Sequence, residues 1–211
     1  MKKGIFDKIY EAGIIPVIKI SNVEDAVPLA NALKKGGLRV LEVTFRTDCA
    51  AEAIARIKKE VPGVTLIAGT VLNIENAEKA VGLGVEAIVS PGLNPEVVKW
   101  CLSRNINICP GIATATEIEQ AMSFGLDLVK FFPAEASGGL KMLKALSAPY
   151  FNMRFMPTGG IDESNFLEYL GFDKVIACGG SWMTREDLIK AGKFDEIENI
   201  TRSAVNKIIR R

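Results

Sequence analysis

A single lysine interrupts an apolar run in DLVKFFPAEA, residues 127–136. Lys130 stands between Val129 and Phe131, in a composition typical of a buried β-strand. Burying an unpaired ammonium there costs several kcal/mol, so folding alone would favour valine. A lysine in a partly apolar pocket near another cation can react as the free amine and attack a ketone to form a Schiff base. We therefore interpret Lys130 as a nucleophile.

A carboxylate and a guanidinium occur close together in VLEVTFR, residues 40–46. Because strand side chains alternate between two faces, Val40, Glu42, Thr44 and Arg46 are predicted to share one face. The planar fork of Arg46 suits the carboxylate of a 2-oxo acid. The chain contains no histidine, so proton transfer falls to another group, and Glu42 is the candidate.

Two further strands are predicted to add to this face. In LDLVKFF, residues 126–132, alternation turns Leu128, Lys130 and Phe132 inward. In TLIAGT, residues 65–70, it turns Leu66, Ala68 and Thr70 inward, and Pro91 ends the following strand. A lysine, a carboxylate, a guanidinium and a hydroxyl are thus expected to converge. A structural ion pair between Glu42 and Lys130 is the alternative that involves no chemistry.

The order of elements predicts how these side chains are held. Short β-rich runs start at Ile14, Leu38, Thr65, Glu86, Ile106, Leu126, Met153 and Asp173, with amphipathic segments between them. Eight such units predict an α/β fold of the (β/α)8 TIM barrel class, with residues 1–211 as one domain and MKKGIFDKIYEAG as an extra N-terminal helix. An open doubly wound sheet is the alternative, but no G-x-G-x-x-G follows the first run.

Two glycine-rich stretches end the seventh and eighth units. They are PTGGID and CGGSW, each expected to lead into a helix. Glycine lets the backbone approach a ligand, and helix N-terminal amides receive an anion. The loops after strands seven and eight of a barrel are a frequent phosphate site. The predicted phosphate cradle comprises Thr158, Gly159, Gly160, Gly179, Gly180 and Ser181, whereas Trp182 is interpreted as packing.

The amino-acid composition limits the classes of molecule that the protein is expected to bind. Lys and Arg total 26 against 25 Asp and Glu, a balance that lacks the basic surface of a nucleic-acid or membrane binder, so a small-molecule substrate is expected. The four cysteines form no C-x-x-C pair and are interpreted as reduced thiols; neither a metal nor a cofactor is expected. Charged residues interrupt the N-terminal segment and no apolar run reaches bilayer length, which predicts a cytoplasmic protein.

Seven stretches together resemble a known family. They are VLEVTFRT, AGTVLN, SPGLNPEV, PGIATATE, VKFFPAEASGG, FMPTGGI and GGSW, and they extend from about Ile14 to Trp182. The family comprises the 2-keto-3-deoxy-6-phosphogluconate (KDPG) aldolases and the 4-hydroxy-2-oxoglutarate (KHG) aldolases, which are class I aldolases.

The resemblance implies a role for each site residue. Lys130 is the implied Schiff-base lysine and Glu42 the implied general acid and base. Arg46 and Thr70 are implied to hold a pyruvate-like carboxylate in a pocket walled by Pro91 and Phe132. The phosphate end is implied to use Thr158, Gly159, Gly160, Gly180 and Ser181.

The implied reaction is the reversible cleavage of 2-dehydro-3-deoxy-6-phosphogluconate to pyruvate and glyceraldehyde 3-phosphate, without a metal. A homotrimer with a role in carbohydrate metabolism is also implied. Three alternatives stay open: cleavage of 4-hydroxy-2-oxoglutarate to pyruvate and glyoxylate, in place of or beside the first activity; a phosphogalactonate-type aldolase; and a phosphosugar isomerase or decarboxylase in which Lys130 only donates a proton. A non-catalytic assembly protein that keeps the fold is a further alternative.

Overall fold

The computed structural model describes residues 4–208, in which nine short strands alternate with helices. The strands are β1 (Ile14–Ile18), β2 (Val40–Thr44), β3 (Thr65–Gly69), β4 (Ala87–Val89), β5 (Asn107–Cys109), β6 (Gly111–Ile112), β7 (Leu128–Phe131), β8 (Arg154–Pro157) and β9 (Cys178–Gly180). The helices are α1 (Ile5–Ala12), a 3-10 turn η1 (Val23–Asp25), α2 (Ala26–Lys35), α3 (Ala50–Glu60), α4 (Ile74–Gly82), α5 (Pro95–Ser103), α6 (Ala115–Ser123), α7 (Gly139–Ser147), α8 (Phe166–Leu170), α9 (Glu186–Lys190) and α10 (Phe194–Lys207).

Every one of the eight predicted β-rich runs contains a strand. The fifth run contains two, β5 and β6, which flank Pro110. Proline has no N–H to donate to a ladder, so the strand is interrupted at that residue. The Pro110 carbonyl still accepts a hydrogen bond from the Lys130 amide at 2.9 Å, which keeps the run paired with β7.

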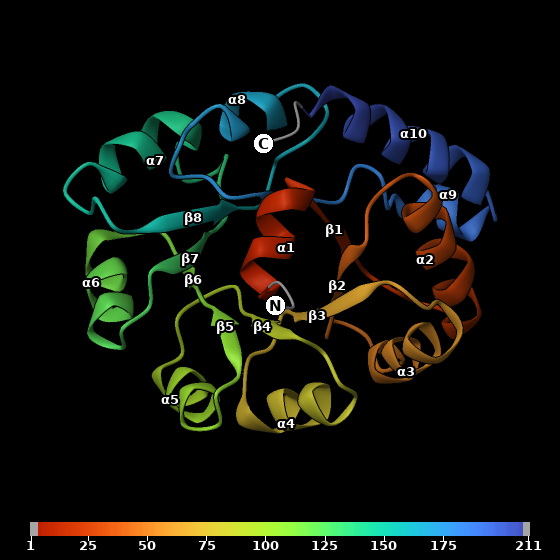
Figure 1. Ribbon diagram of the computed structural model, residues 1–211, viewed down its shortest axis with the longest axis horizontal. Helices are drawn as coiled ribbons and strands as arrows, with labels where there is room; N and C mark the ends of the chain where they lie inside the picture. The colour runs from red at the N-terminus through yellow and green to blue at the C-terminus, as the bar shows by residue number, and fades with distance from the viewer. Residues whose placement is uncertain (1–3, 209–211) are drawn as a thin grey trace.

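All strand pairs are parallel. One sheet has the order β5-β4-β3-β2-β1-β9 and the other has the order β6-β7-β8. Isolated parallel bridges join Phe155 to Val175 and Thr158 to Gly179, so β8 lies beside the segment that contains β9. Figure 1 shows the strands curled around a centre with the helices α2 to α10 outside them, an arrangement that fits the α/β class.

The two faces of the curled sheet bury different residues. Concave-face residues come from successive strands and form one cluster, which includes Ile15, Val40, Ile67, Val89, Cys109, Leu128 and Met156. Their sequence neighbours, such as Leu41, Val43, Val129 and Phe131, pack with the outer helices. The predicted alternation in β2 and β7 is therefore confirmed.

The alternation predicted for β3 is wrong. Ile67 belongs to the concave cluster, whereas Leu66 and Ala68 pack toward the outer helices. The register explains the difference, because Glu42 pairs with Ile67 and neighbours in parallel register share a face. Thr70 follows the strand with a positive φ of 57°, so its placement does not follow from strand alternation.

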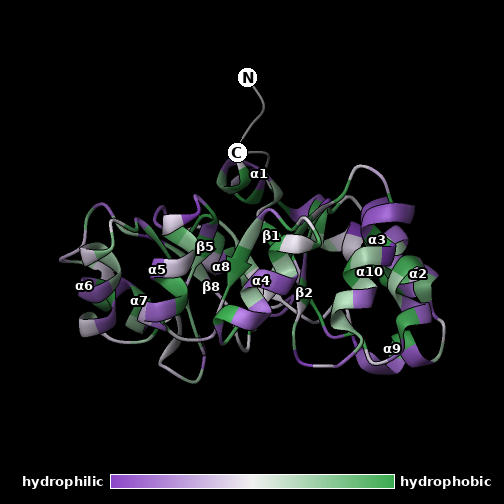
Figure 2. Ribbon diagram, turned by 90° about the horizontal axis from the view of Figure 1, so that it is seen from below, coloured by the Kyte–Doolittle hydropathy of each residue, from purple (hydrophilic) through white to green (hydrophobic). Residues whose placement is uncertain are grey.

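Helix α1 lies at the centre of the ring in Figure 1 and on one side of the molecule in Figure 2. Its apolar residues Ile5 and Ile9 pack into the concave cluster. Lys8 adds an ion pair with Glu86 at 2.6 Å and a hydrogen bond to Thr65 at 3.3 Å. The helix therefore covers the end of the sheet at which the strands begin.

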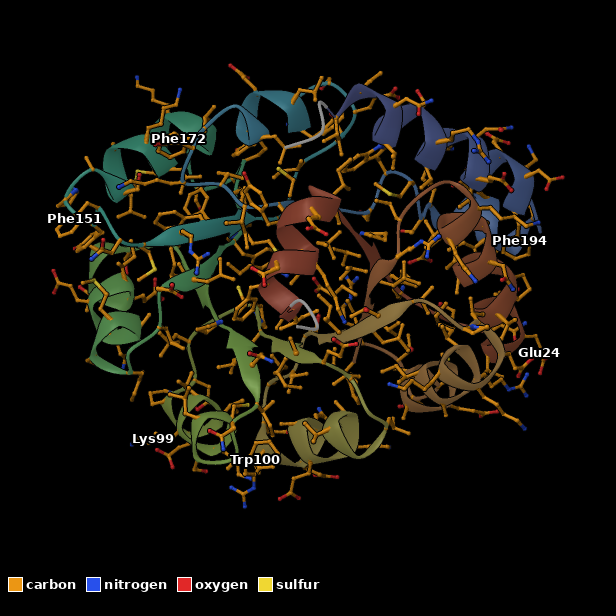
Figure 3. All side chains as sticks on the ribbon, viewed as in Figure 1. Glu24, Lys99, Trp100, Phe151, Phe172 and Phe194 are labelled. Carbon is orange, nitrogen blue, oxygen red and sulfur yellow. The ribbon has the colours of Figure 1, made fainter. Side chains whose placement is uncertain are left out.

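Local sequence signals fix several helix starts. Asn73 and Asn94 accept backbone N–H groups at the starts of α4 and α5, and Pro95 occupies the first turn of α5. Thr114 and Glu117 form a capping box at α6. Figure 3 shows Glu24, Lys99 and Phe151 at the periphery of the ring. Within residues 4–208, no helix has the length and apolar character needed to cross a bilayer.

Candidate active site

Lys130 and Glu42 meet on the concave face of the sheet. Lys130 Nζ lies 3.4 Å from Glu42 Oε1, and the side chains are 6% and 0% exposed. Both residues sit within strands, β7 and β2, whose backbones are held by parallel ladders on either side. A buried ion pair of this kind removes two charges from water together, which limits the cost of burying each.

The second carboxylate oxygen of Glu42 differs from the first in its surroundings. Oε2 is buried and has no hydrogen-bond partner among the described residues. A buried oxygen without a partner is costly in a purely structural ion pair. In an enzyme, by contrast, a carboxylate oxygen without a partner can accept a proton from a substrate or from a water molecule.

Gly69 provides the space for Glu42. A Cβ at Gly69 would lie 2.1 Å from Glu42 Oε1 and 2.7 Å from its Cγ. Gly69 lies opposite Thr44 in the register of β2 and β3. Sequence reasoning missed this residue, because a glycine at a strand end is common and gives no signal by itself.

The surroundings of Lys130 are largely apolar. Its Nζ lies 5.3 Å from the centre of the Phe132 ring, which is within range of a cation–π contact. Cys109 faces the same interior, and burial raises its pKa to about 12, with Lys130 opposing and Glu42 reinforcing that shift. The thiol is therefore protonated at neutral pH. None of the four cysteines, Cys49, Cys101, Cys109 and Cys178, forms a disulfide bond, and all four lie within the described residues.

Arg46 is oriented by its neighbour on the same face. The Arg46 Nε donates to Thr44 Oγ1 at 3.1 Å, and the Thr44 hydroxyl donates to the Ile18 carbonyl at 2.8 Å. Thr44 is 1% exposed, so its bond to Ile18 is buried, whereas Arg46 itself is exposed and its bond to Thr44 is partly buried. This bond leaves the terminal nitrogens of Arg46 available for an anion. Thr44 was placed on this face by the sequence, but no role could be given to it without the Ile18 contact.

Pro91 comes close to the strand next to Lys130. Its carbonyl oxygen would lie 2.0 Å from a Cβ at Gly111, and Gly111 is the register partner of Lys130. The absence of a side chain at Gly111 thus lets the turn after β4 approach β6, the strand that pairs with β7. Pro91 and Phe132 are both half-buried at this edge of the sheet.

The structure brings the two glycine stretches together. Thr158 bridges Gly179, and a Cβ at Gly179 would lie 2.3 Å from Thr158 Oγ1. That hydroxyl is buried without a partner among the described residues. Gly159 and Gly160 have φ values of 100° and 77°, a region that favours glycine. Ser181, which follows Gly180 in the chain, is exposed.

The expected helix N-termini at these glycines are not formed. Helices α8 and α9 have five residues each and begin only at Phe166 and Glu186. After Gly160 the chain instead forms a turn, in which Asp162 N donates to Asn165 Oδ1 and Ser164 N donates to Asp162 Oδ1. Any anion here would therefore be held by loop amides and hydroxyls. Trp182 stacks on Phe166, with ring centres 5.6 Å apart, in agreement with a packing role.

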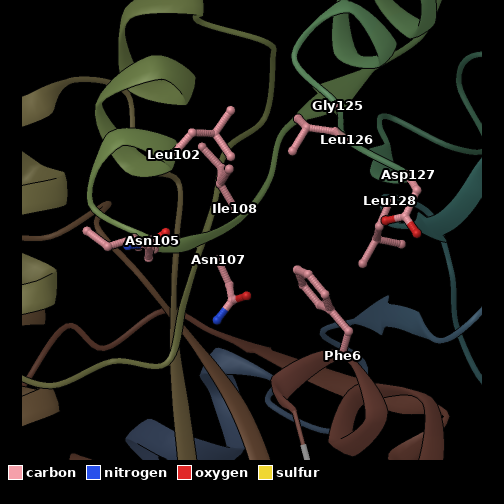
Figure 4. Close-up of a pocket in the computed structure, with 10 residues that line it drawn as sticks. Phe6, Leu102, Asn105, Asn107, Ile108, Gly125, Leu126, Asp127 and Leu128 are labelled. Carbon is pink, nitrogen blue, oxygen red and sulfur yellow. The ribbon is translucent and has the colours of Figure 1, made fainter.

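A separate cavity of about 340 Å³ opens near the start of β5 and β7 (Figure 4). Phe6 of α1, Leu102, Ile108 and Leu128 line it together with Asn105, Ile106, Asn107, Gly125, Leu126 and Asp127. Neither Lys130 nor Glu42 contributes to its wall. It lacks the combination of groups found on the concave face and is not part of the candidate site.

Comparison with known proteins identifies relatives of the whole chain. Residues 5–200 match the family model described as KDPG and KHG aldolase. The chain is 51% identical over 201 residues to a 2-dehydro-3-deoxy-phosphogluconate aldolase of Treponema pallidum, covering 95% of this chain and 96% of that protein. It is 45% identical over 192 residues to the KHG/KDPG aldolase of Escherichia coli K12, covering 91% of this chain and 90% of that protein.

A solved structure has the same fold. It is the KDPG aldolase of Legionella pneumophila with pyruvate captured as a covalent carbinolamine intermediate. The two structures align with a TM-score of 0.92 at 36% sequence identity, over 97% of this chain and 99% of that one.

Replacing Gly69 tests how tightly Glu42 is confined. Gly69→Ala is expected to lower the free energy of unfolding by about 1–3 kcal/mol, because its methyl group displaces the buried carboxylate. Urea unfolding provides the measurement, with Gly82→Ala as the control, since nothing lies within 4 Å of a Cβ there. The loss should shrink in a Glu42→Ala background. An unchanged stability of Gly69→Ala would contradict the close approach.

Proposed function

Because the chain belongs to the KDPG and KHG aldolase family, we propose that it is a class I aldolase that reversibly cleaves 2-dehydro-3-deoxy-6-phosphogluconate to pyruvate and glyceraldehyde 3-phosphate. It is a carbon–carbon lyase. The observation that carries the proposal is the buried pair of Lys130 and Glu42, in which one carboxylate oxygen has no partner among the described residues.

The proposed reaction begins at the substrate carboxylate. Arg46, held at Nε by Thr44, binds that group with its terminal nitrogens, assisted by Thr70, and thereby directs the C2 ketone toward Lys130. Pro91 and Phe132 wall the pocket and limit the access of water. Attack by the amine is therefore faster than it would be on a substrate that is not held in this orientation.

Covalent chemistry follows at Lys130. The amine adds to C2, and Glu42 transfers protons as the carbinolamine loses water to give an iminium ion. Glu42, or a water molecule that it holds, then removes the C4 hydroxyl proton. The C3–C4 electron pair moves toward the iminium nitrogen, which yields an enamine and an aldehyde. Protonation and hydrolysis release pyruvate and regenerate Lys130.

The far end of the substrate carries a phosphate. We assign it to the loop amides and hydroxyls of Thr158, Gly159, Gly160, Gly179, Gly180 and Ser181. The bridge between Thr158 and Gly179 and the unpartnered Thr158 hydroxyl support this assignment. Neighbouring residues of the chain occupy the space beside each of the four glycines, so the missing side chains allow these segments to pack closely.

A second substrate fits the same chemistry. Cleavage of 4-hydroxy-2-oxoglutarate to pyruvate and glyoxylate needs the Lys130 end of the site and no phosphate cradle. The 45% identical Escherichia coli relative, whose name joins both activities, favours a dual activity here. A phosphogalactonate-type substrate differs in stereochemistry and would use the same groups.

We further propose that residues 1–211 form one domain, a closed (β/α)8 barrel with α1 as an additional helix. The bridges between β8 and the β9 segment and the passage of β5 into β6 support closure. Family membership supports a homotrimer in the cytoplasm. Sedimentation equilibrium should give three times the mass of one chain, and a monomeric mass would contradict the trimer.

Covalent trapping tests the central chemistry. Incubation with pyruvate and sodium borohydride should add one reduced pyruvyl group to Lys130 of the wild type, measured by intact mass and peptide mapping. Lys130→Ala should take up none, and Lys144→Ala should behave as the wild type. Because Lys130→Ala leaves Glu42 buried and unpaired, Lys130→Ala with Glu42→Gln serves as a second variant. An unmodified wild type would overturn the aldolase proposal.

Enlarging Ser181 tests the phosphate end. Ser181→Phe should raise KM for the phosphorylated substrate by about ten-fold or more, because the ring blocks the cradle and removes the hydroxyl. KM for 4-hydroxy-2-oxoglutarate should change little. Ser181 is exposed, so the variant should fold, and Ser103→Phe on α5 is the matched control. An equal rise of KM for both substrates would contradict the assignment of the phosphate site.

A further inference from the structure

A tyrosine and a glutamate outside the proposed machinery form a hydrogen bond beside the glycine loop. The hydroxyl of Tyr169, on α8, donates to Glu135 Oε1 in the loop after β7. Tyr169 is 1% exposed, and its ring packs in the core cluster. Burial, and then the bond to Glu135, raises the pKa of Tyr169. The hydroxyl therefore stays protonated and able to donate at neutral pH.

Glu135 is in direct contact with the Gly159–Gly160 segment. Its backbone N–H donates to the Gly159 carbonyl at 3.0 Å. A Cβ at Gly160 would lie 2.6 Å from the Glu135 Cβ and 2.7 Å from its Cγ. The side chain therefore lies against the glycine, and Glu135 is packed directly on this part of the loop.

Two further hydrogen bonds restrain the loop. Asn165 Nδ2 donates to the Gly160 carbonyl at 3.1 Å, and Ala134 N donates to the Thr158 carbonyl at 2.8 Å. Because the carbonyls of Thr158 and Gly160 both accept hydrogen bonds, the orientation of the backbone amides in this loop is restrained as well. The Tyr169 hydroxyl is the contact that fixes the Glu135 side chain within this set.

Direction matters here because the cradle contains no cation of its own. Residues 158–160 and 179–181 include neither lysine nor arginine. Recognition of a phosphate by loop amides and hydroxyls then depends on where those dipoles point. Glu135 has the same sign of charge as a phosphate, so it is unsuited to bind one directly.

We propose that Tyr169 and Glu135 are positioning residues that hold the Thr158–Gly160 loop in the geometry required for phosphorylated substrates. This inference rests on the proposed function and assigns substrate specificity to a pair that makes no contact with the reacting carbon. Loss of the pair is expected to weaken the binding of ligands that carry a phosphate and to leave the binding of ligands without a phosphate unchanged.

The test removes the hydroxyl alone. Tyr169→Phe keeps the buried ring, so the variant should fold, and KM for the phosphorylated substrate should rise about ten-fold while KM for 4-hydroxy-2-oxoglutarate and both kcat values stay within about two-fold. Glu135→Ala should act in the same way. Glu135→Gln retains an oxygen that can accept the hydroxyl and should cause a smaller rise.

The chain offers a matched control. Tyr150, which is half-buried, donates to Glu119 at 3.0 Å, the same chemistry in a solvent-exposed hydrogen bond outside the glycine loop. Tyr150→Phe should leave both KM values unchanged. Equal changes of KM on both substrates in Tyr169→Phe, or no change on either, would overturn the inference.

A second measurement is independent of turnover. Titration calorimetry with glycerol 3-phosphate should show about ten-fold weaker binding to Tyr169→Phe than to the wild type. Pyruvate trapping at Lys130 in the same preparations should be equal in both. Trapping without selective weakening refutes the positioning role and leaves the aldolase intact. Selective weakening without trapping supports the positioning role and refutes the Schiff-base chemistry. Absence of binding to the wild type refutes the inference.

Discussion

The buried ion pair of Lys130 and Glu42 is the constraint on which the rest of this structure depends. Each charge alone would cost several kcal/mol at such a depth, and together they remain costly unless the geometry is well defined. Parallel ladders on both sides of β2 and β7 supply that definition, and Gly69 leaves room for the carboxylate. The pair is only partly satisfied, because Glu42 Oε2 has no partner among the described residues. That deficit is expected of a proton-transfer group.

The two ends of the proposed site offer different groups to an anion. At the Lys130 end, a guanidinium is oriented by Thr44 and offers a charged fork. At the glycine end, the segments contain no cation, so backbone geometry takes the place of charge. A charged side chain tolerates small displacements, whereas amide dipoles do not. The contacts around Gly159 and Gly160 from Glu135 and Asn165 therefore matter more than their distance from the reacting carbon suggests.

Strand periodicity was reliable where a charged residue distinguished one face of the strand from the other. In β2 and β7 it assigned Glu42 and Lys130 to the concave face correctly. In β3 it failed, since Leu66, Ala68 and Ile67 are all apolar and give no contrast between faces. The helices expected directly after the glycines were also wrong, because side-chain bonds from Asp162 and Asn165 stabilise a turn there. Short-range polar competition of this kind is difficult to read from composition.

The sequence by itself determined the α/β class, the order of the strands and the identity of the lysine, carboxylate and arginine, because period, residue type and spacing are local properties. Only the tertiary structure decided which groups touch. Residues 42 and 130 are 88 positions apart, and the 3.4 Å between their charges follows from sheet curvature and register. The space at Gly69, the orientation of Arg46 by Thr44 and the contact of Tyr169 with Glu135 depend likewise on atoms brought together from distant strands and helices. No pairwise spacing in the chain encodes such contacts, since they arise only when the strands curl around a common interior.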